Sequence, residues 1–65
     1  MNGSSRYAGM TVNERLLAAG LLAAFDRAAR SRDRAEMLRL LRRVDVPAPE
    51  ETVAAVLANP WRYGY

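Results

Sequence analysis

The chain contains no cysteine, no histidine and no lysine. Without cysteine there is no disulfide and no thiol nucleophile, and without histidine the commonest general base and metal ligand are missing. The absence of lysine removes the amine that a Schiff base or a P-loop requires. The acidic residues form no cluster with the spacing of a metal site. We therefore expect no catalytic residue, no metal ligand and no cofactor, and we expect that the protein is not an enzyme.

Long apolar runs are also absent. The longest, Leu16–Phe25, spans ten residues, whereas a membrane span needs about 20. A secretory signal is not indicated either, because Glu14 stands where its basic region would lie and no small-residue cleavage site follows Phe25. We expect a soluble protein with no membrane partner, and the lack of cysteine fits a cytoplasmic location.

The length of 65 residues is enough for one small domain. A chain this short is marginally stable unless disulfides or a metal reinforce it, and this sequence provides neither. Good helix packing or self-association must then supply the stability. A homodimer is therefore one of the alternatives that the sequence leaves open.

The first helix has a clear start signal. Residues 1–10 are small and polar and are predicted to form a disordered arm, followed by a domain over 11–65. Thr11 and Glu14 match a capping box, in which each side chain accepts a hydrogen bond from the other residue's backbone. The apolar residues that follow predict one long helix over 12–30.

One face of this long helix is expected to be buried. Gly20 lies in its middle and is interpreted as the point where a second helix crosses closely. The predicted buried stripe has helical spacing and consists of Leu17, Leu21, Phe25 and Ala28.

Two shorter helices are predicted after it. Asp33 is a suitable N-cap for a helix over 34–43, and Pro49 suits the first turn of a helix over 49–58. Their predicted inward residues are Met37, Leu38, Leu41, Val44, Val53, Val56 and Leu57. The fold class is therefore all-α: a small three-helix domain with an aromatic C-terminal tail, residues 59–65, packed across it.

The aromatic tail carries the main functional hypothesis. Three of the five aromatic residues lie in the last five positions, as Trp61, Tyr63 and Tyr65. Tryptophan, tyrosine and arginine are the residues enriched at binding hot spots. We expect Trp61 to close the core, and Arg62, Tyr63, Gly64 and Tyr65 to contact a protein partner. The sequence thus favours a small accessory or regulatory protein that acts by protein–protein interaction, with an unknown partner or with itself.

Nonspecific binding of nucleic acid is the alternative function. An arginine-rich face is predicted on the first two helices, consisting of Arg27, Arg30, Arg34, Arg39, Arg42 and Arg43. A sequence-reading helix-turn-helix is not indicated, because the helix over 49–58 begins with Glu50 and Glu51 where DNA phosphates would lie. Asp26 is interpreted as the four-residue ion-pair partner of Arg30 rather than as a catalytic acid.

Two segments carry a resemblance. The start Thr-Val-Asn-Glu-Arg-Leu (11–16) and the ending Asn-Pro-Trp-Arg-Tyr-Gly-Tyr (59–65) resemble those of a group of short bacterial helical proteins of uncharacterised function. In that group a similar start and ending frame two or three helices rich in alanine and leucine. The resemblance covers about residues 10–65 and implies a small helical bacterial protein, but it carries no activity.

Overall fold

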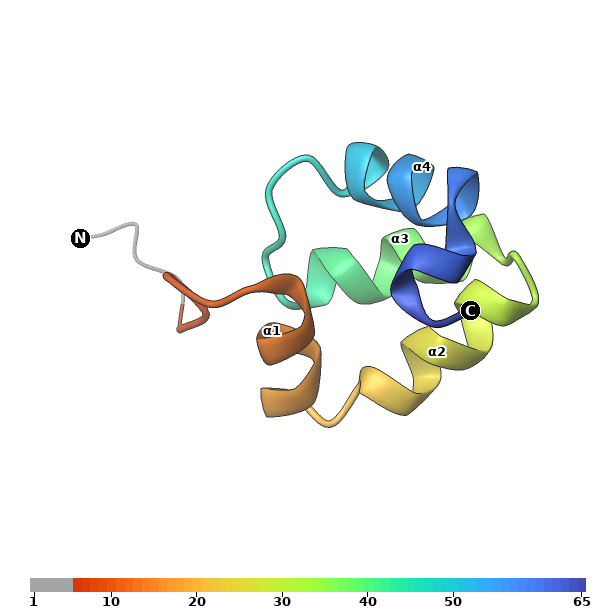
Figure 1. The fold of residues 1–65 in the computed structure, drawn as a ribbon. Coiled ribbons are helices and arrows are strands. Elements are labelled where there is room, and N and C mark those ends of the chain that lie inside the picture. The colour runs from red at the N-terminus through yellow and green to blue at the C-terminus, as the bar shows by residue number, and fades with distance from the viewer. Residues whose placement is uncertain (1–5) are drawn as a thin grey trace.

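The computed structural model of the protein describes residues 6–65 (Figure 1). They form four α-helices and one 3-10 helix, and no strand: α1 (Val12–Ala18), α2 (Leu22–Arg30), α3 (Arg34–Arg43), α4 (Pro49–Ala58) and η1 (Pro60–Tyr63). The all-helical class is confirmed. Half of the predicted disordered arm, residues 1–5, lies outside the described residues, while residues 6–9 form a turn closed by a 3.0 Å hydrogen bond from the Met10 N–H to the Tyr7 carbonyl.

The prediction of one helix over 12–30 is wrong, because the chain breaks and changes direction between α1 and α2. Gly20 has φ of 73°, a left-handed conformation that only glycine adopts at little cost. The Gly20 N–H donates to the Leu17 carbonyl at 3.1 Å and the Leu21 N–H donates to the Leu16 carbonyl at 2.8 Å. These two bonds form a Schellman motif, which ends a helix. No atom lies within 4 Å of the place where a Gly20 side chain would begin, so this glycine serves a turn and not a helix crossing.

The break changes which side chains of the first helix are buried. Leu16 has no exposed surface, whereas Leu17, which belonged to the predicted stripe, is 67% exposed. A continuous helix would have held Leu17 in register with Phe25. Because the turn at Gly20 redirects the chain, α1 buries the face next to the predicted one.

The remaining helix starts follow the sequence signals. The capping box is present, with the Glu14 N–H donating to Thr11 Oγ1 at 3.1 Å and the Thr11 N–H donating to Glu14 Oε1 at 2.8 Å. Asp33 Oδ1 accepts a 3.2 Å bond from the Glu36 N–H. Helices α3 and α4 have the predicted bounds.

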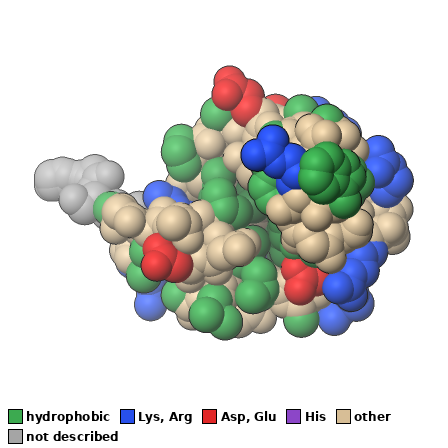
Figure 2. Space-filling model, viewed as in Figure 1, with side chains coloured by type: hydrophobic (Ala, Val, Ile, Leu, Met, Phe, Trp, Pro, Cys, Tyr) green, Lys and Arg blue, Asp and Glu red, His purple; other side chains and the backbone are tan. Residues whose placement is uncertain are grey.

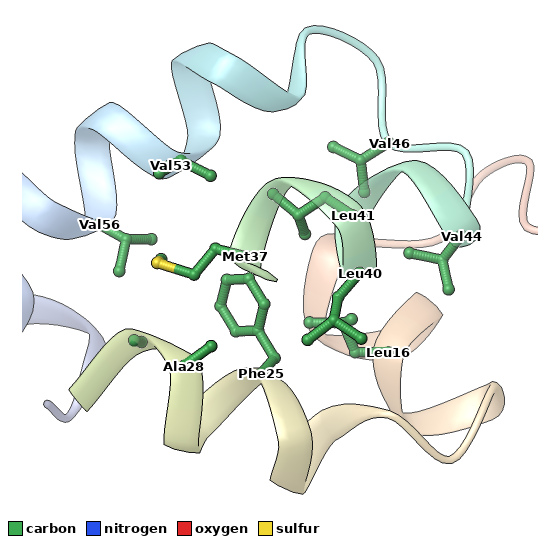
Figure 3. Close-up of a cluster of buried hydrophobic side chains, with 11 residues drawn as sticks. Leu16, Phe25, Ala28, Met37, Leu40, Leu41, Val44, Val46, Val53 and Val56 are labelled. Atoms are coloured by element: carbon green, nitrogen blue, oxygen red, sulfur yellow. The ribbon is translucent and has the colours of Figure 1, made fainter. Parts of the chain in front are cut away.

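The core forms around α3, which lies between α2 and α4 and behind the other elements in the view of Figure 1. Met37, Leu40 and Leu41 project from α3 toward the side chains of α1, α2 and α4 (Figure 3). No charged or polar side chain of residues 6–65 is buried with them. The buried side chains are Leu16, Phe25, Ala28, Ala29, Met37, Leu40, Leu41, Val44, Val46, Val53 and Val56.

Arg15 joins three segments at one end of the molecule. Its Nε donates to the Met10 carbonyl at 3.0 Å, and its Nη1 donates to the carbonyls of Val44 at 3.0 Å and Asp45 at 2.8 Å. The last carbonyls of a helix lack partners within the helix and carry its negative partial charge. The Arg15 guanidinium therefore caps the C-terminal end of α3 and ties α1 to it.

Replacing Arg15 by methionine should destabilise the domain by about 1–2 kcal/mol, because it removes charged hydrogen bonds at a partly exposed site. The aliphatic part of the side chain is retained, so the loss reports on the guanidinium. Urea denaturation followed by circular dichroism measures the change. Arg27→Met is the matched control, since Arg27 is exposed and its guanidinium forms no hydrogen bond or ion pair within residues 6–65. Equal stability of the two variants would contradict this role for Arg15.

Candidate functional site

The aromatic tail (residues 59–65) forms a single helical turn that bends back on itself. Pro60 starts η1 and Gly64 follows it with φ of 87°. At this left-handed residue the chain turns, and the Tyr65 N–H donates to the Pro60 carbonyl at 2.9 Å. The turn brings Tyr65 to the side of α2.

Tyr65 is the residue of the tail that is tied to the domain. It packs against the core, and its hydroxyl donates a 2.6 Å hydrogen bond to Asp26 Oδ1 on α2. Burial, and then the bond to this carboxylate, raise the pKa of Tyr65 to about 12. The ion pair expected between Asp26 and Arg30 is not present in the described part of the chain. Asp26 instead holds the tail.

Trp61 contradicts the expectation that it closes the core. Its side chain is 74% exposed, and Tyr63 is 50% exposed. The core is already filled by side chains of the four α-helices and of the segment between α3 and α4, and the turn at Gly64 gives the position against α2 to Tyr65. The structure thus exchanges the expected roles of the first and last aromatic residues of the tail.

A groove of about 930 Å³ lies beside the tail. Its lining residues come from α4, α2, the start of α1 and the tail, which lie above, below, to the left and to the right in Figure 1. Figure 2 shows hydrophobic side chains in the hollow of this face. The groove is lined by Thr11, Val12, Asn13, Leu22, Phe25, Asp26, Arg30, Glu51, Thr52, Ala55, Val56, Arg62, Tyr63, Gly64 and Tyr65.

Three charged residues of the groove, Glu51, Arg30 and Arg62, lie toward its two ends. Glu51 lies in the first turn of α4, whereas Arg62 follows the end of that helix. Arg30 is the last residue of α2, which runs in the same direction as α4 across the view (Figure 1). The groove also contains Asp26, whose carboxylate accepts the hydrogen bond from Tyr65. The end beside α1 therefore carries the acidic Glu51, and the end beside the tail carries two arginines and the bonded carboxylate of Asp26. Glu51, Arg30 and Arg62 form no ion pair within residues 6–65.

The structure brings together the four tail residues predicted to bind a partner. Arg62, Tyr63, Gly64 and Tyr65 all line the groove, although the function assigned to them remains a prediction. Sequence reasoning missed the opposite wall, which α2 and α4 provide. Of the groove, only the helical turn of the tail could be predicted from the sequence, because Pro60 and Gly64 mark its beginning and end.

The six arginines of the alternative nucleic-acid face are all exposed, but their partners and positions differ. Arg39 binds Glu36 through two hydrogen bonds of 2.8 and 2.6 Å, and Arg42 binds Glu50 at 2.9 Å. Arg30 lines the groove. Arg27 lies on α2, while Arg34 and Arg43 are the first and last residues of α3, about 13 Å apart along the helix.

The hydrogen bond of Tyr65 gives a pH-dependent prediction. An unfolded tyrosine has a pKa of about 10, so the folded state favours the protonated phenol. The contribution of this residue to stability is present in full below pH 10 and should be lost as the pH rises toward 12. Replacement by phenylalanine should cost about 1 kcal/mol at neutral pH and remove this alkaline loss of stability.

Tyrosinate absorbance measures the titration directly. The difference between the titration curves of the wild type and Tyr65→Phe should have its midpoint near the raised pKa of about 12. Asp26→Asn, which keeps the shape but removes the carboxylate charge, should move that midpoint down. A difference curve centred on the value of a free tyrosine would show that Tyr65 is not held in this way.

Comparison with known proteins adds no assignment. The chain matches no protein-family model, no curated protein and no solved structure. Within residues 6–65, no three histidine, cysteine, aspartate or glutamate side chains come together as a metal site. Over the same residues no helix has the length and apolar character needed to cross a bilayer. The groove and the exposed tail side chains therefore provide the basis for a functional proposal.

Proposed function

We propose that this is a non-enzymatic protein of the cytoplasm that acts by binding another protein through the groove and the aromatic tail beside it. The observation that carries the proposal is Trp61, whose large apolar side chain is 74% exposed next to an open groove. Tryptophan is the residue type most enriched at the energetic centre of interfaces. It is also costly to leave in water, because full burial of a large apolar side chain is worth about 2 kcal/mol or more.

The composition of the groove supports a protein partner. Apolar side chains such as Val12 and Leu22 line the groove together with hydroxyl, amide and charged groups, and protein interfaces likewise combine apolar and polar contacts. The anchored Tyr65 holds the tail turn in one conformation, and a surface held in its bound form loses less entropy on binding.

The side chains of the groove do not favour a catalytic function. The raised pKa of Tyr65 keeps its phenol protonated at neutral pH, whereas a tyrosine that acts as a base or nucleophile needs a lowered pKa. Nucleic acid is also less suited to this face, because Glu51 and Asp26 would oppose phosphates along part of the groove.

Site-specific photo-cross-linking in cells tests the proposal. A photoreactive amino acid at position 63, on the rim of the groove, should give covalent adducts with protein. The same group at Ala35, an exposed residue of α3 outside the groove, should give few. Adding Trp61→Ala should reduce the adducts from position 63. If position 63 gives no more adducts than position 35, this face is not a protein-binding site.

A further inference from the structure

We infer that the partner of this face is a second copy of the chain, and that each copy places its Trp61 in the groove of the other. The inference rests on the proposed function, since it names the partner for the same surface. It is carried by three observations on the described residues: the division of charge along the groove, the free position of Trp61, and the groups at the acidic end.

The charge pattern of the groove is complementary to itself. In a contact with two-fold symmetry, each pair of residues occurs twice with the roles exchanged. Glu51 lies in the first turn of α4, and Arg62 lies in η1, which follows the last turn of that helix. A two-fold axis through the middle of the groove would place Arg62 of each copy against Glu51 of the other. A partner with charge of one sign would be repelled at one of the two ends.

Trp61 is free to enter a second groove because it does not line its own. It lies at the basic end, next to Arg62, and the same two-fold axis carries it to the acidic end of the other copy. Val12 and Leu22 supply apolar surface there. A buried indole needs an acceptor for its N–H, and the Glu51 carboxylate provides one at that end.

Self-association would also add stability to a chain that is too short to bury a large core. The domain has no disulfide, and its core consists of eleven side chains, of which nine are alanine, valine or leucine. Short chains without reinforcement gain stability by burying surface against a second copy. The exposed aromatic side chains of the tail are the largest apolar surface available for that purpose.

Concentration dependence provides the test. Trp61 is the single tryptophan of the chain, so its emission reports its own environment. As the protein is concentrated, sedimentation should show a shift from monomer to dimer, and the emission maximum should move to shorter wavelength over the same range. Trp61→Ala should weaken the dimer by about 30-fold or more, as expected for an interface hot spot. Leu17→Ala removes an apolar side chain of similar exposure outside the groove and should leave the dimer unchanged.

Charge reversal tests the two-fold arrangement itself. Glu51→Arg and Arg62→Glu should each weaken the dimer by about tenfold, because each sets like charges against one another. The double variant carries both changes in one chain and should recover most of the loss, since the opposite charges again face each other. Circular dichroism checks that each variant retains the helical content of the wild type.

Three results would overturn the inference. One is a protein that stays monomeric at all concentrations with unchanged tryptophan emission. The second is a dimer that responds to Leu17→Ala as strongly as to Trp61→Ala. The third is a double charge variant whose dimer is weaker than those of both single variants. These results leave the proposed function standing if cross-linking from position 63 yields adducts with a different protein. Absence of any adduct from position 63 removes the proposed function as well.

Discussion

Replacing Met37 by alanine is expected to cause a large loss of stability. Met37 is completely buried and lies between the ring of Phe25 on α2 and Val56 on α4 (Figure 3). Such a replacement costs about 2–5 kcal/mol, because apolar contacts are lost and a cavity remains. A domain of this length has a total stability of about 3–10 kcal/mol. The change therefore removes a large part of it.

Leu17→Ala is the matched control for Met37→Ala. It also shortens a large apolar side chain on a helix, but at a position that is 67% exposed, where substitutions change stability by about 0.5 kcal/mol or less. Urea denaturation of both variants, followed by circular dichroism, measures the difference. The opposite order, with Leu17→Ala the more damaging, would mean that α1 buries the stripe expected for an unbroken helix.

Replacing Gly20 by alanine is expected to destabilise the protein by about 1–2 kcal/mol. A side chain at φ of 73° brings Cβ close to the following carbonyl, and this cost exceeds the gain from a less flexible unfolded chain. There is open space around Gly20, so backbone strain and not a clash causes the loss. An unbroken helix would give the opposite sign, because alanine is the better helix former.

The reverse substitution at Ala48 provides the control for this interpretation. Ala48 has φ of 51° and precedes Pro49, the first residue of α4, so it carries the strain that Gly20 avoids. Ala48→Gly should stabilise the protein by about 0.5–1 kcal/mol. Thermal denaturation of the two variants should shift in opposite directions. A shift in the same direction would show that the positive φ values do not control stability at these turns.

Helix starts could be predicted because their signals are local. The side chains of Thr11, Glu14 and Asp33 accept hydrogen bonds from N–H groups in the first turn of a helix, and Pro49 has no N–H to satisfy. Neighbouring residues therefore suffice to recognise these starts. The left-handed turns were harder to predict from the sequence. A glycine in an apolar run, such as Gly20, can mark either a close contact between helices or a turn that ends a helix. Only the packing of the later helices decides between the two.

The tail shows why burial could not be assigned from residue type alone. Trp61 is more apolar than Tyr65, and a hydrophobic ranking would bury it first. Gly64, however, turns the chain so that Tyr65 faces Asp26, and these residues are 39 positions apart. That contact depends on the direction of α2, which in turn depends on the break at Gly20. The groove has the same origin, because its walls come from segments that meet only in the folded chain.

The exposure of Trp61 in the single chain is the central claim, since both the proposed function and the inferred dimer depend on it. Quenching of its fluorescence by acrylamide, at a dilution where the protein sediments as a monomer, tests it most directly. The structure predicts a quenching constant close to that of the same protein unfolded in urea. A constant several-fold lower in the folded monomer would contradict the account, because Trp61 would then be part of the core.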